Sequence, residues 1–182
     1  MASAIVKRVG LSAGLWAAGD ATCQLIVPNV LGVPAAPYDM MQTARQALFG
    51  GLFMASAGHG FYGGIEKLLP GTALKNVVGK VAADQFIFAP ALLSGLFYSM
   101  ALLEGQPHSV GVDRVSSTLL PALQMNWTVW PVITALNQTV VPVAQRVTVV
   151  NLVCIPWTAY LAYKNCTAKQ AEAQAAAGAA AQ

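Results

Sequence analysis

The candidate functional residues of this sequence are polar side chains inside otherwise apolar segments. They are two aspartates, an arginine, a histidine and four amides: Asp20, Gln24, His59, Asp84, Gln85, Asn137, Arg146 and Asn151. Each is costly in hydrocarbon, so such groups normally face the interior of a helix bundle or a water-filled cavity. Two interpretations are open. Either the residues pair for structural reasons, with Arg146 as the countercharge of Asp20 or Asp84, or they line a hydrated pore.

No catalytic motif accompanies these residues. The sequence has no Gly-rich phosphate loop, no serine nucleophile elbow and no HExxH metal-binding pair. The three cysteines, Cys23, Cys154 and Cys166, form no CxxC pair, which argues against a zinc site or a disulfide framework. The net charge of +3 is small and scattered, unlike a nucleic-acid-binding surface. We therefore expect a protein that is not an enzyme, has no cofactor or metal, and does not bind nucleic acid.

The composition indicates that these polar residues are positioned by membrane helices. Charged residues make up 9% of the 182 residues, against about 25% in ordinary globular domains. A hydrocarbon layer about 30 Å thick requires apolar segments of about 20 residues. The sequence predicts an all-α integral membrane bundle with four spans, at approximately residues 9–27, 46–65, 81–103 and 142–163. A central aspartate costs about 3 kcal/mol on insertion, so the first span needs partners for Asp20.

Small residues recur every four positions along three of the spans, a spacing that allows helices to pack closely. The three sets are Gly10, Gly14 and Ala18; Ser56, Gly60 and Gly64; and Ala91, Gly95 and Ser99. Pro90 should kink the third span unless neighbouring groups take up the carbonyl that it frees. Lys80 and Asp84 are four residues apart, so a local ion pair is the simplest expectation for this aspartate.

The segment before the last span contains no charge between residues 115 and 145. One helix of that length would be about 46 Å long, and we expect Pro121, Pro131 and Pro142 to divide it. We predict an interfacial or re-entrant helix at 115–139, with Trp127 and Trp130 at the headgroup level. Residues 1–167 would form the membrane domain, and 168–182 an Ala-rich tail.

The distribution of basic residues favours four spans over three. With four spans, the N-terminus, the 66–80 loop and the C-terminus share one side of the membrane. That side would hold seven Lys and Arg residues and the other side two, as the positive-inside rule expects.

Several short motifs together resemble the Mpv-seventeen / 22-kilodalton peroxisomal membrane protein family. The resemblance covers about residues 10–163. The GD…Q, YD…T.R and H..Y patterns of the family begin at Gly19, Tyr38 and His59, and its DQ…P pattern begins at Asp84. Its closing signature is matched by Trp127, Trp130, Pro131, Pro142, Trp157 and Tyr160. Departures include Thr134, where glutamine is usual, and Gln138, where phenylalanine is usual.

The resemblance implies a four-helix organellar membrane protein, multi-pass, with channel-like passage of small solutes or metabolites. It implies the mitochondrial inner membrane or, alternatively, the peroxisomal membrane; the short, basic, acid-free start of the chain favours mitochondria. A second hypothesis is a structural or accessory subunit of a larger mitochondrial complex, such as a respiratory complex. The expected partners are the lipid bilayer and either further copies of the chain or other subunits.

Overall fold

A computed structural model describes residues 2–31, 37–71, 73–140 and 146–180. All regular secondary structure in these ranges is helical, which confirms the all-α prediction. In chain order the elements are α1 (Ala2–Leu25), α2 (Val27–Leu31), α3 (Met40–Leu48), η1 (Phe49–Met54), α4 (Ala55–Leu68), α5 (Leu74–Ala83), η2 (Asp84–Phe88), α6 (Ala89–Leu103), α7 (His108–Thr139) and α8 (Arg146–Ala180).

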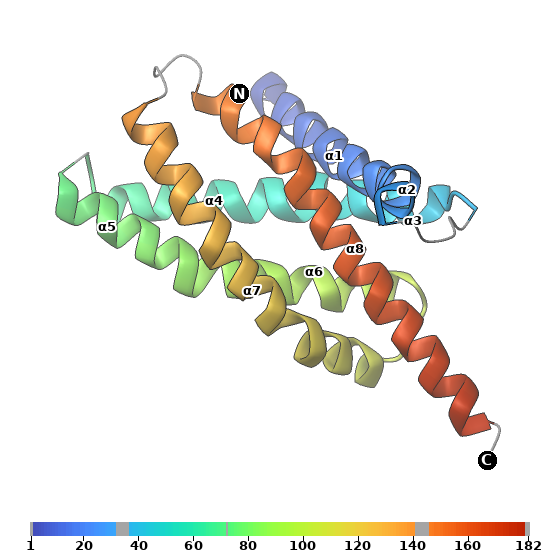
Figure 1. The fold of residues 1–182 in the computed structure, drawn as a ribbon. Helices are drawn as coiled ribbons and strands as arrows, with labels where there is room; N and C mark the ends of the chain where they lie inside the picture. The colour runs from blue at the N-terminus through green and yellow to red at the C-terminus, as the bar shows by residue number, and fades with distance from the viewer. Residues whose placement is uncertain (1, 32–36, 72, 141–145, 181–182) are drawn as a thin grey trace.

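The described elements form long rods that pass back and forth along one bundle (Figure 1). The wide π-helical turns η1 and η2 join α3 to α4 and α5 to α6, so that each pair makes one continuous rod. In η2 the Ala89 N–H bonds the Asp84 carbonyl five residues back. The chain thus leaves the regular four-residue ladder just before Pro90, which has no N–H to continue it.

The expected division of residues 115–145 is wrong at Pro121 and Pro131, whereas the helix predicted at 115–139 is present within α7. Both prolines lie inside α7, one helix of 32 residues and so about 48 Å long. A proline interrupts the hydrogen-bond ladder only locally, and packing against neighbours can hold the helix together. Here the Tyr160 hydroxyl on α8 donates to the Pro121 carbonyl at 3.4 Å. Pro142, the third predicted breaker, lies outside the described residues.

Helix α8 runs parallel to α1, which corrects the predicted topology. The Thr158 hydroxyl donates to the Leu15 carbonyl, and the Cys166 thiol lies beside Cys23, so equal steps along the two helices stay in register. Figure 1 shows α1 and α8 running in the same direction along the bundle. The chain makes one more pass along the bundle than the four-span prediction, because α7 is itself a full-length rod. The side of the membrane on which each terminus lies stays a prediction.

By length and hydropathy alone, one continuous helical stretch among the described residues, Leu74–Leu103, is long and apolar enough to cross a membrane. It contains the predicted span 81–103. The spans at 9–27, 46–65 and 142–163 stay predictions.

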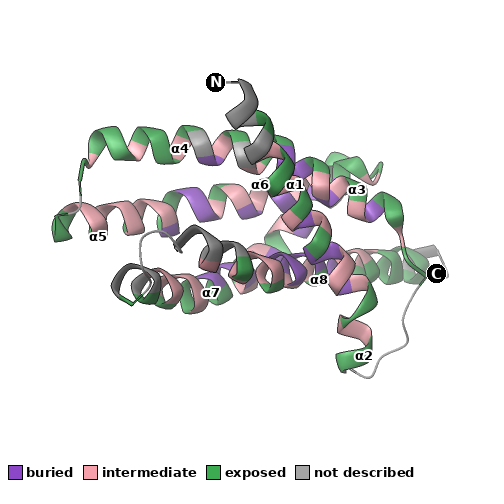
Figure 2. Cartoon of the chain, turned by 90° about the horizontal axis from the view of Figure 1, so that it is seen from above, coloured by how far each residue is buried: buried purple, intermediate pink, exposed green. Residues whose placement is uncertain are grey.

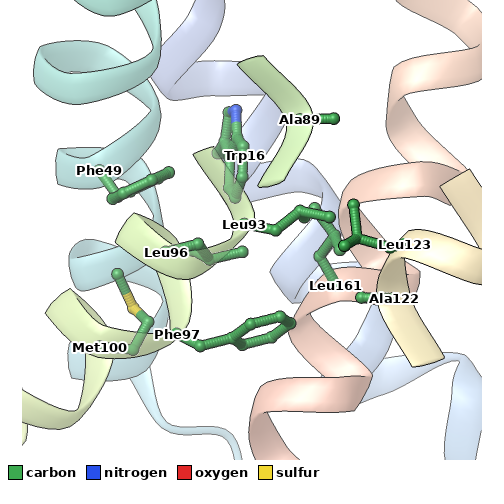
Figure 3. Close-up of a cluster of buried hydrophobic side chains, with 10 residues drawn as sticks. All are labelled: Trp16, Phe49, Ala89, Leu93, Leu96, Phe97, Met100, Ala122, Leu123 and Leu161. Atoms are coloured by element: carbon green, nitrogen blue, oxygen red, sulfur yellow. The ribbon is translucent and has the colours of Figure 1, made fainter. Parts of the chain in front are cut away.

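The core lies where the rods meet (Figure 3). Its buried side chains come from α1, η1, α6, α7 and α8: Trp16, Phe49, Ala89, Leu93, Leu96, Phe97, Met100, Ala122, Leu123 and Leu161. Trp16 and Phe49 meet edge to face with ring centroids 5.2 Å apart. The buried residues follow the inward faces of the helices, and exposed residues follow the outward faces (Figure 2).

The closest approach of α1 and α8 is at Gly19. A Cβ added there would meet the Thr158 side chain and would lie 2.8 Å from the Thr158 backbone carbonyl carbon. By contrast, a Cβ at Gly10, Gly14, Gly60 or Gly64 meets nothing within 4 Å. The predicted small-residue faces of the first two spans therefore do not make the tight contacts in the described structure.

We predict that Gly19→Ala lowers thermal stability in detergent while Gly10→Ala does not. The first adds a methyl group where α1 touches Thr158, and overpacking of this kind costs about 1–3 kcal/mol. The second adds a methyl group in open space on the same helix, where alanine is favoured over glycine by about 0.5–1 kcal/mol. Differential scanning fluorimetry of the purified variants measures both. Equal melting temperatures for the two variants would contradict the packing at Gly19.

Candidate functional site

Asp20 lies fully buried at the centre of a hydrogen-bonded cluster near the end of α1. Its carboxylate accepts hydrogen bonds from Gln24 Nε2 at 2.7 Å, from Gln42 Nε2 at 2.8 Å and from the Thr43 hydroxyl. Gln24 also bonds both backbone groups of Asp39, at 2.7 and 3.0 Å. These neutral donors from α1 and α3 are the partners that the structure describes for Asp20, and they tie the start of α3 to the end of α1.

Asp84 and Gln85 belong to a second polar cluster, which joins α4, η2 and α7. The Tyr62 hydroxyl donates to Asp84 Oδ1 at 2.6 Å, and Gln85 Nε2 donates to Asp84 Oδ2 at 2.7 Å. Buried Asn126 donates to Gln85 Oε1 at 2.8 Å. The expected ion pair between Lys80 and Asp84 is wrong. Lys80 reaches Glu66, 2.6 Å away across the turn between α4 and α5.

The structure does not bring Asp20 and Asp84 together, since they belong to separate clusters. The side chains of His59, Asn137, Arg146 and Asn151 lie outside the described residues, although their backbones form part of α4, α7 and α8. The pairing of Arg146 with Asp20 or Asp84 therefore stays a prediction.

The aromatic residues of the family-like signature contact neighbouring elements, although Trp127 itself is exposed. Trp130 and Trp157 meet edge to face at 5.9 Å, and Trp157 lies 5.5 Å from Tyr160. The Trp127 indole N–H donates to the Gln85 carbonyl at 3.2 Å. Trp130 thus packs between α7 and α8, and its predicted position at the headgroup level stays a prediction. Pro131 follows it inside α7.

Two cavities lie at successive levels along the α1–α8 pair. The Asp84 cavity, of about 440 Å³, is bordered by Leu11–Trp16 of α1 and Cys154–Thr158 of α8, with Tyr62, Asp84 and Asn126 among its polar residues. The Cys166 cavity, of about 660 Å³, is bordered by Cys23–Pro28 and by α8 from Tyr163 to Ala173. Gln24 and Gln42, the partners of Asp20, line the Cys166 cavity.

The two cavities share no lining residue. Buried residues of both helices lie between them: Gly19 and Asp20 on α1, and Thr158, Ala159, Leu161 and Ala162 on α8, of which Thr158 also lines the Asp84 cavity; we call this set the closed layer. Trp16 and Cys23, on the two sides of the layer, are seven residues apart, or about 10 Å along the helix.

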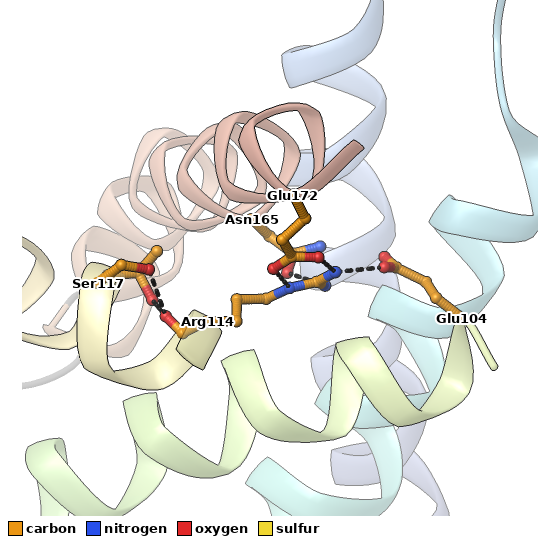
Figure 4. A network of polar contacts seen from close by, with 6 residues as sticks. Glu104, Arg114, Ser117, Asn165 and Glu172 are labelled. Carbon is orange, nitrogen blue, oxygen red and sulfur yellow. Dashed lines mark hydrogen bonds and ion pairs between the residues drawn. The ribbon is translucent and has the colours of Figure 1, made fainter. Parts of the chain in front are cut away.

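A third polar site is centred on Arg114, a residue that the sequence analysis did not identify as a candidate. The Arg114 side chain is fully buried, bonds Glu104 at 2.8 Å and bonds both carboxylate oxygens of Glu172 at 2.6 and 2.7 Å (Figure 4). It also donates to Asn165 at 3.1 Å. Glu104 and Arg114 flank the turn between α6 and α7, a spacing that could have suggested their pair. Glu172 lies 58 residues away, and nothing in the sequence marks it as the partner.

The Arg114 site fixes the far end of α8. Burial alone would lower the pKa of the guanidinium, but hydrogen bonds and charge from Glu172 and Glu104 outweigh burial and raise that pKa above its ordinary value. Arg114 is therefore always charged, and its bidentate bond with Glu172 is of the strong, directional kind. It holds α8 against α7 next to the stretch of α8 that borders the Cys166 cavity.

Together, an all-helical bundle, buried polar clusters and an outer surface rich in exposed apolar side chains define a helical membrane protein.

The model of the Mpv17 / PMP22 family matches residues 101–162. Protein SYM1 of Saccharomyces cerevisiae is 34% identical over 160 residues, covering 85% of this chain and 80% of the relative. Protein sym-1 of Neurospora crassa is 33% identical over 153 residues, covering 83% and 86%. Peroxisomal membrane protein 2 of Bos taurus is 37% identical over 124 residues, covering 68% and 63%.

The chain belongs to the Mpv17 / PMP22 family, which confirms the resemblance inferred from the motifs. No solved structure matches it.

We predict that Arg114→Met destabilises the protein by about 3–5 kcal/mol, because it leaves Glu104 and Glu172 without their countercharge. Replacing all three residues, as Glu104→Met, Arg114→Met and Glu172→Met, should restore most of the stability, since no buried charge is then left unpaired. Thermal unfolding in detergent of the single and triple variants measures the difference. A triple variant no more stable than Arg114→Met would contradict the assignment of these three residues as one interdependent ionic site.

Proposed function

We propose that this protein is a conduit, not an enzyme, through which small solutes or metabolites pass across the mitochondrial inner membrane. The observation that supports the proposal is the pair of cavities at successive levels of the bundle, with the closed layer between them. In this proposal the described arrangement is a shut state, and an open state requires the closed layer to part, including buried Asp20 and Leu161. At Gly19 and Thr158 the contact between α1 and α8 joins small side chains, so little apolar surface has to be separated at that point.

Polar groups on both sides of the closed layer favour a hydrated route. The Asp84 cavity contains a carboxylate, a phenol and a buried amide; the Cys166 cavity contains Asp39, Gln42 and Lys169. Water and polar solutes need such hydrogen-bonding partners inside a low-dielectric bundle. Asp20, at the layer itself, has its lone pairs taken up by Gln24, Gln42 and Thr43.

The outer surface of the bundle supports the bilayer placement. Large apolar side chains face outward on several rods: Leu11, Leu25, Leu52, Phe53, Phe86, Ile87, Leu120, Val132 and Leu152. Phe86 and Ile87 expose 69% and 63% of their surface in the middle of the Leu74–Leu103 rod. Hydrocarbon chains rather than water are the favourable neighbours for such a surface.

The organelle is part of the proposal. The basic, acid-free start of the chain supports the mitochondrial inner membrane. The name of the bovine relative, peroxisomal membrane protein 2, supports the peroxisomal membrane as the alternative. Fractionation of cells that produce a C-terminally tagged chain decides between the two membranes.

We predict that the purified protein, reconstituted in liposomes, passes small uncharged and charged solutes, and that Thr158→Ala passes them faster. Thr158 fills the closed layer opposite Gly19, so a smaller side chain weakens the closure. Thr128→Ala is the matched control: both hydroxyls donate to a carbonyl one turn earlier at 2.8 Å, but Thr128 is exposed on α7. Solute-loaded vesicles with an encapsulated fluorescent reporter measure the flux.

The absence of flux from both the wild-type protein and Thr158→Ala would contradict the conduit. Equal acceleration by Thr128→Ala and Thr158→Ala would remove the closed layer from the mechanism.

The second candidate function is that of an accessory subunit in a larger membrane complex, or of a self-associating protein. It is supported by α8, which continues to Ala180 beyond the cavities with an exposed, Ala-rich surface. Gentle extraction and native electrophoresis test it against a chain truncated after Ala173, which keeps the Arg114–Glu172 pair. Migration of the full chain only at the size of a monomer or small oligomer would exclude the larger complex.

A further inference from the structure

The lining of the Asp84 cavity combines aromatic rings with one charged group. Five aromatic residues from five separate elements border it: Trp16, Tyr62, Phe88, Trp130 and Trp157. Asp84 is the one charged residue among the lining residues of this cavity that the structure describes. The remaining lining is mostly aliphatic, with Ser12, Asn126 and Thr158 as further polar groups.

The hydrogen-bond partners described for Asp84 are neutral, so none of them neutralises the charge of its carboxylate. Tyr62 O–H and Gln85 Nε2 each donate one hydrogen bond, to different carboxylate oxygens, and both donors are neutral. Each carboxylate oxygen offers two acceptor sites, so both oxygens keep capacity. The nearest lysine along the chain, Lys80, pairs with Glu66. The two neutral donors also hold the carboxylate in a fixed position at the cavity wall.

These two features select the chemistry of a ligand. Aromatic rings attract cations through their negative faces, and a carboxylate adds a full countercharge. A small metal ion would need several oxygen ligands around it, whereas this wall is largely apolar. An organic ammonium, with its charge spread over alkyl groups, suits both the rings and the carboxylate. The volume of about 440 Å³ lies in the range of pockets that hold small organic molecules.

We propose that the Asp84 cavity is a binding site for small organic ammonium ions, with Asp84 as the countercharge and Trp130 and Trp157 as part of the aromatic wall. This inference rests on the proposed conduit only in that the bound ion would be a solute in transit. Binding itself does not require passage, so the two can fail separately.

The test on the wild-type protein uses two probes of the same shape. Choline has a positively charged nitrogen at the position where 3,3-dimethylbutan-1-ol has a neutral carbon. With the protein in lipid nanodiscs, titration of tryptophan fluorescence and calorimetry measure both affinities. We expect saturable binding of choline, at least about tenfold tighter than that of the neutral alcohol. Equal affinities would overturn the proposal, and would identify the cavity as a site for neutral apolar molecules.

Three variants locate the site. Asp84→Asn removes the charge but keeps the shape and an acceptor for Tyr62, and should weaken choline binding about tenfold or more without changing the affinity for the alcohol. Trp157→Leu should weaken choline binding to a smaller extent. Asp113→Asn, at an exposed carboxylate on α7 outside the cavity, should bind choline as the wild type does. Choline binding that survives Asp84→Asn unchanged would overturn the assignment.

Flux measurements separate this inference from the proposed function. Vesicles that pass choline and the alcohol at the same rate, with no effect of Asp84→Asn on binding or flux, would leave the conduit standing and overturn the ammonium site. Charge-dependent choline binding by a protein that passes no solute would overturn the conduit and leave the ammonium site standing.

Discussion

The parallel contact of α1 with α8 at Gly19 and Thr158 is the constraint on which the rest of the structure depends. The two helices come from opposite ends of the chain, and an in-register parallel pair can be joined only through an odd number of intervening passes. The described chain supplies three such passes: α3–η1–α4, α5–η2–α6 and α7. The close approach requires a residue without a side chain, because Thr158 already fills the space opposite. It also sets the two cavities on either side of one thin layer.

The helical class and the approximate position of the helices were predictable from the sequence, since apolar runs of sufficient length leave few other choices in a membrane. The packing partners were not. Gly10, Gly14 and Gly19 are all glycines of the same helix, and spacing every four residues favoured the first two. Only the position of Thr158 on a distant helix makes Gly19 the close contact. Similarly, α7 continues through Pro121, where Tyr160 of α8 bonds the Pro121 carbonyl, a contact that local sequence rules cannot foresee.

Among the polar residues, too, the links within one helix were predictable and the links between distant helices were not. The link between Asp20 and Gln24 follows from their spacing of one helical turn, and it is present. Gln42 and Thr43 join them because α3 begins beside the end of α1, which composition does not specify. The burial of Arg114 was not predictable for the same reason: it depends on Glu172, which α8 brings back to the turn between α6 and α7. The sequence thus identifies which polar groups are unfavourable to bury, while the fold determines which hydrogen-bond and charge partners compensate for their burial.

The three buried or half-buried ionic sites satisfy their charges to different degrees, and the difference separates scaffold from function. Arg114 meets two carboxylates, and its charge is balanced within the protein. Asp20 is surrounded by neutral donors on both oxygens and is fully enclosed. Asp20 lines neither cavity, so a ligand in these cavities does not reach it. Asp84 also has neutral donors on both oxygens, but it borders a cavity and faces aromatic rings there. Incomplete satisfaction of a charge at a cavity wall stabilises a bound counterion. Asp84 is thus the position where polar chemistry serves an external molecule, whereas Asp20 and Arg114 hold together the helices around it.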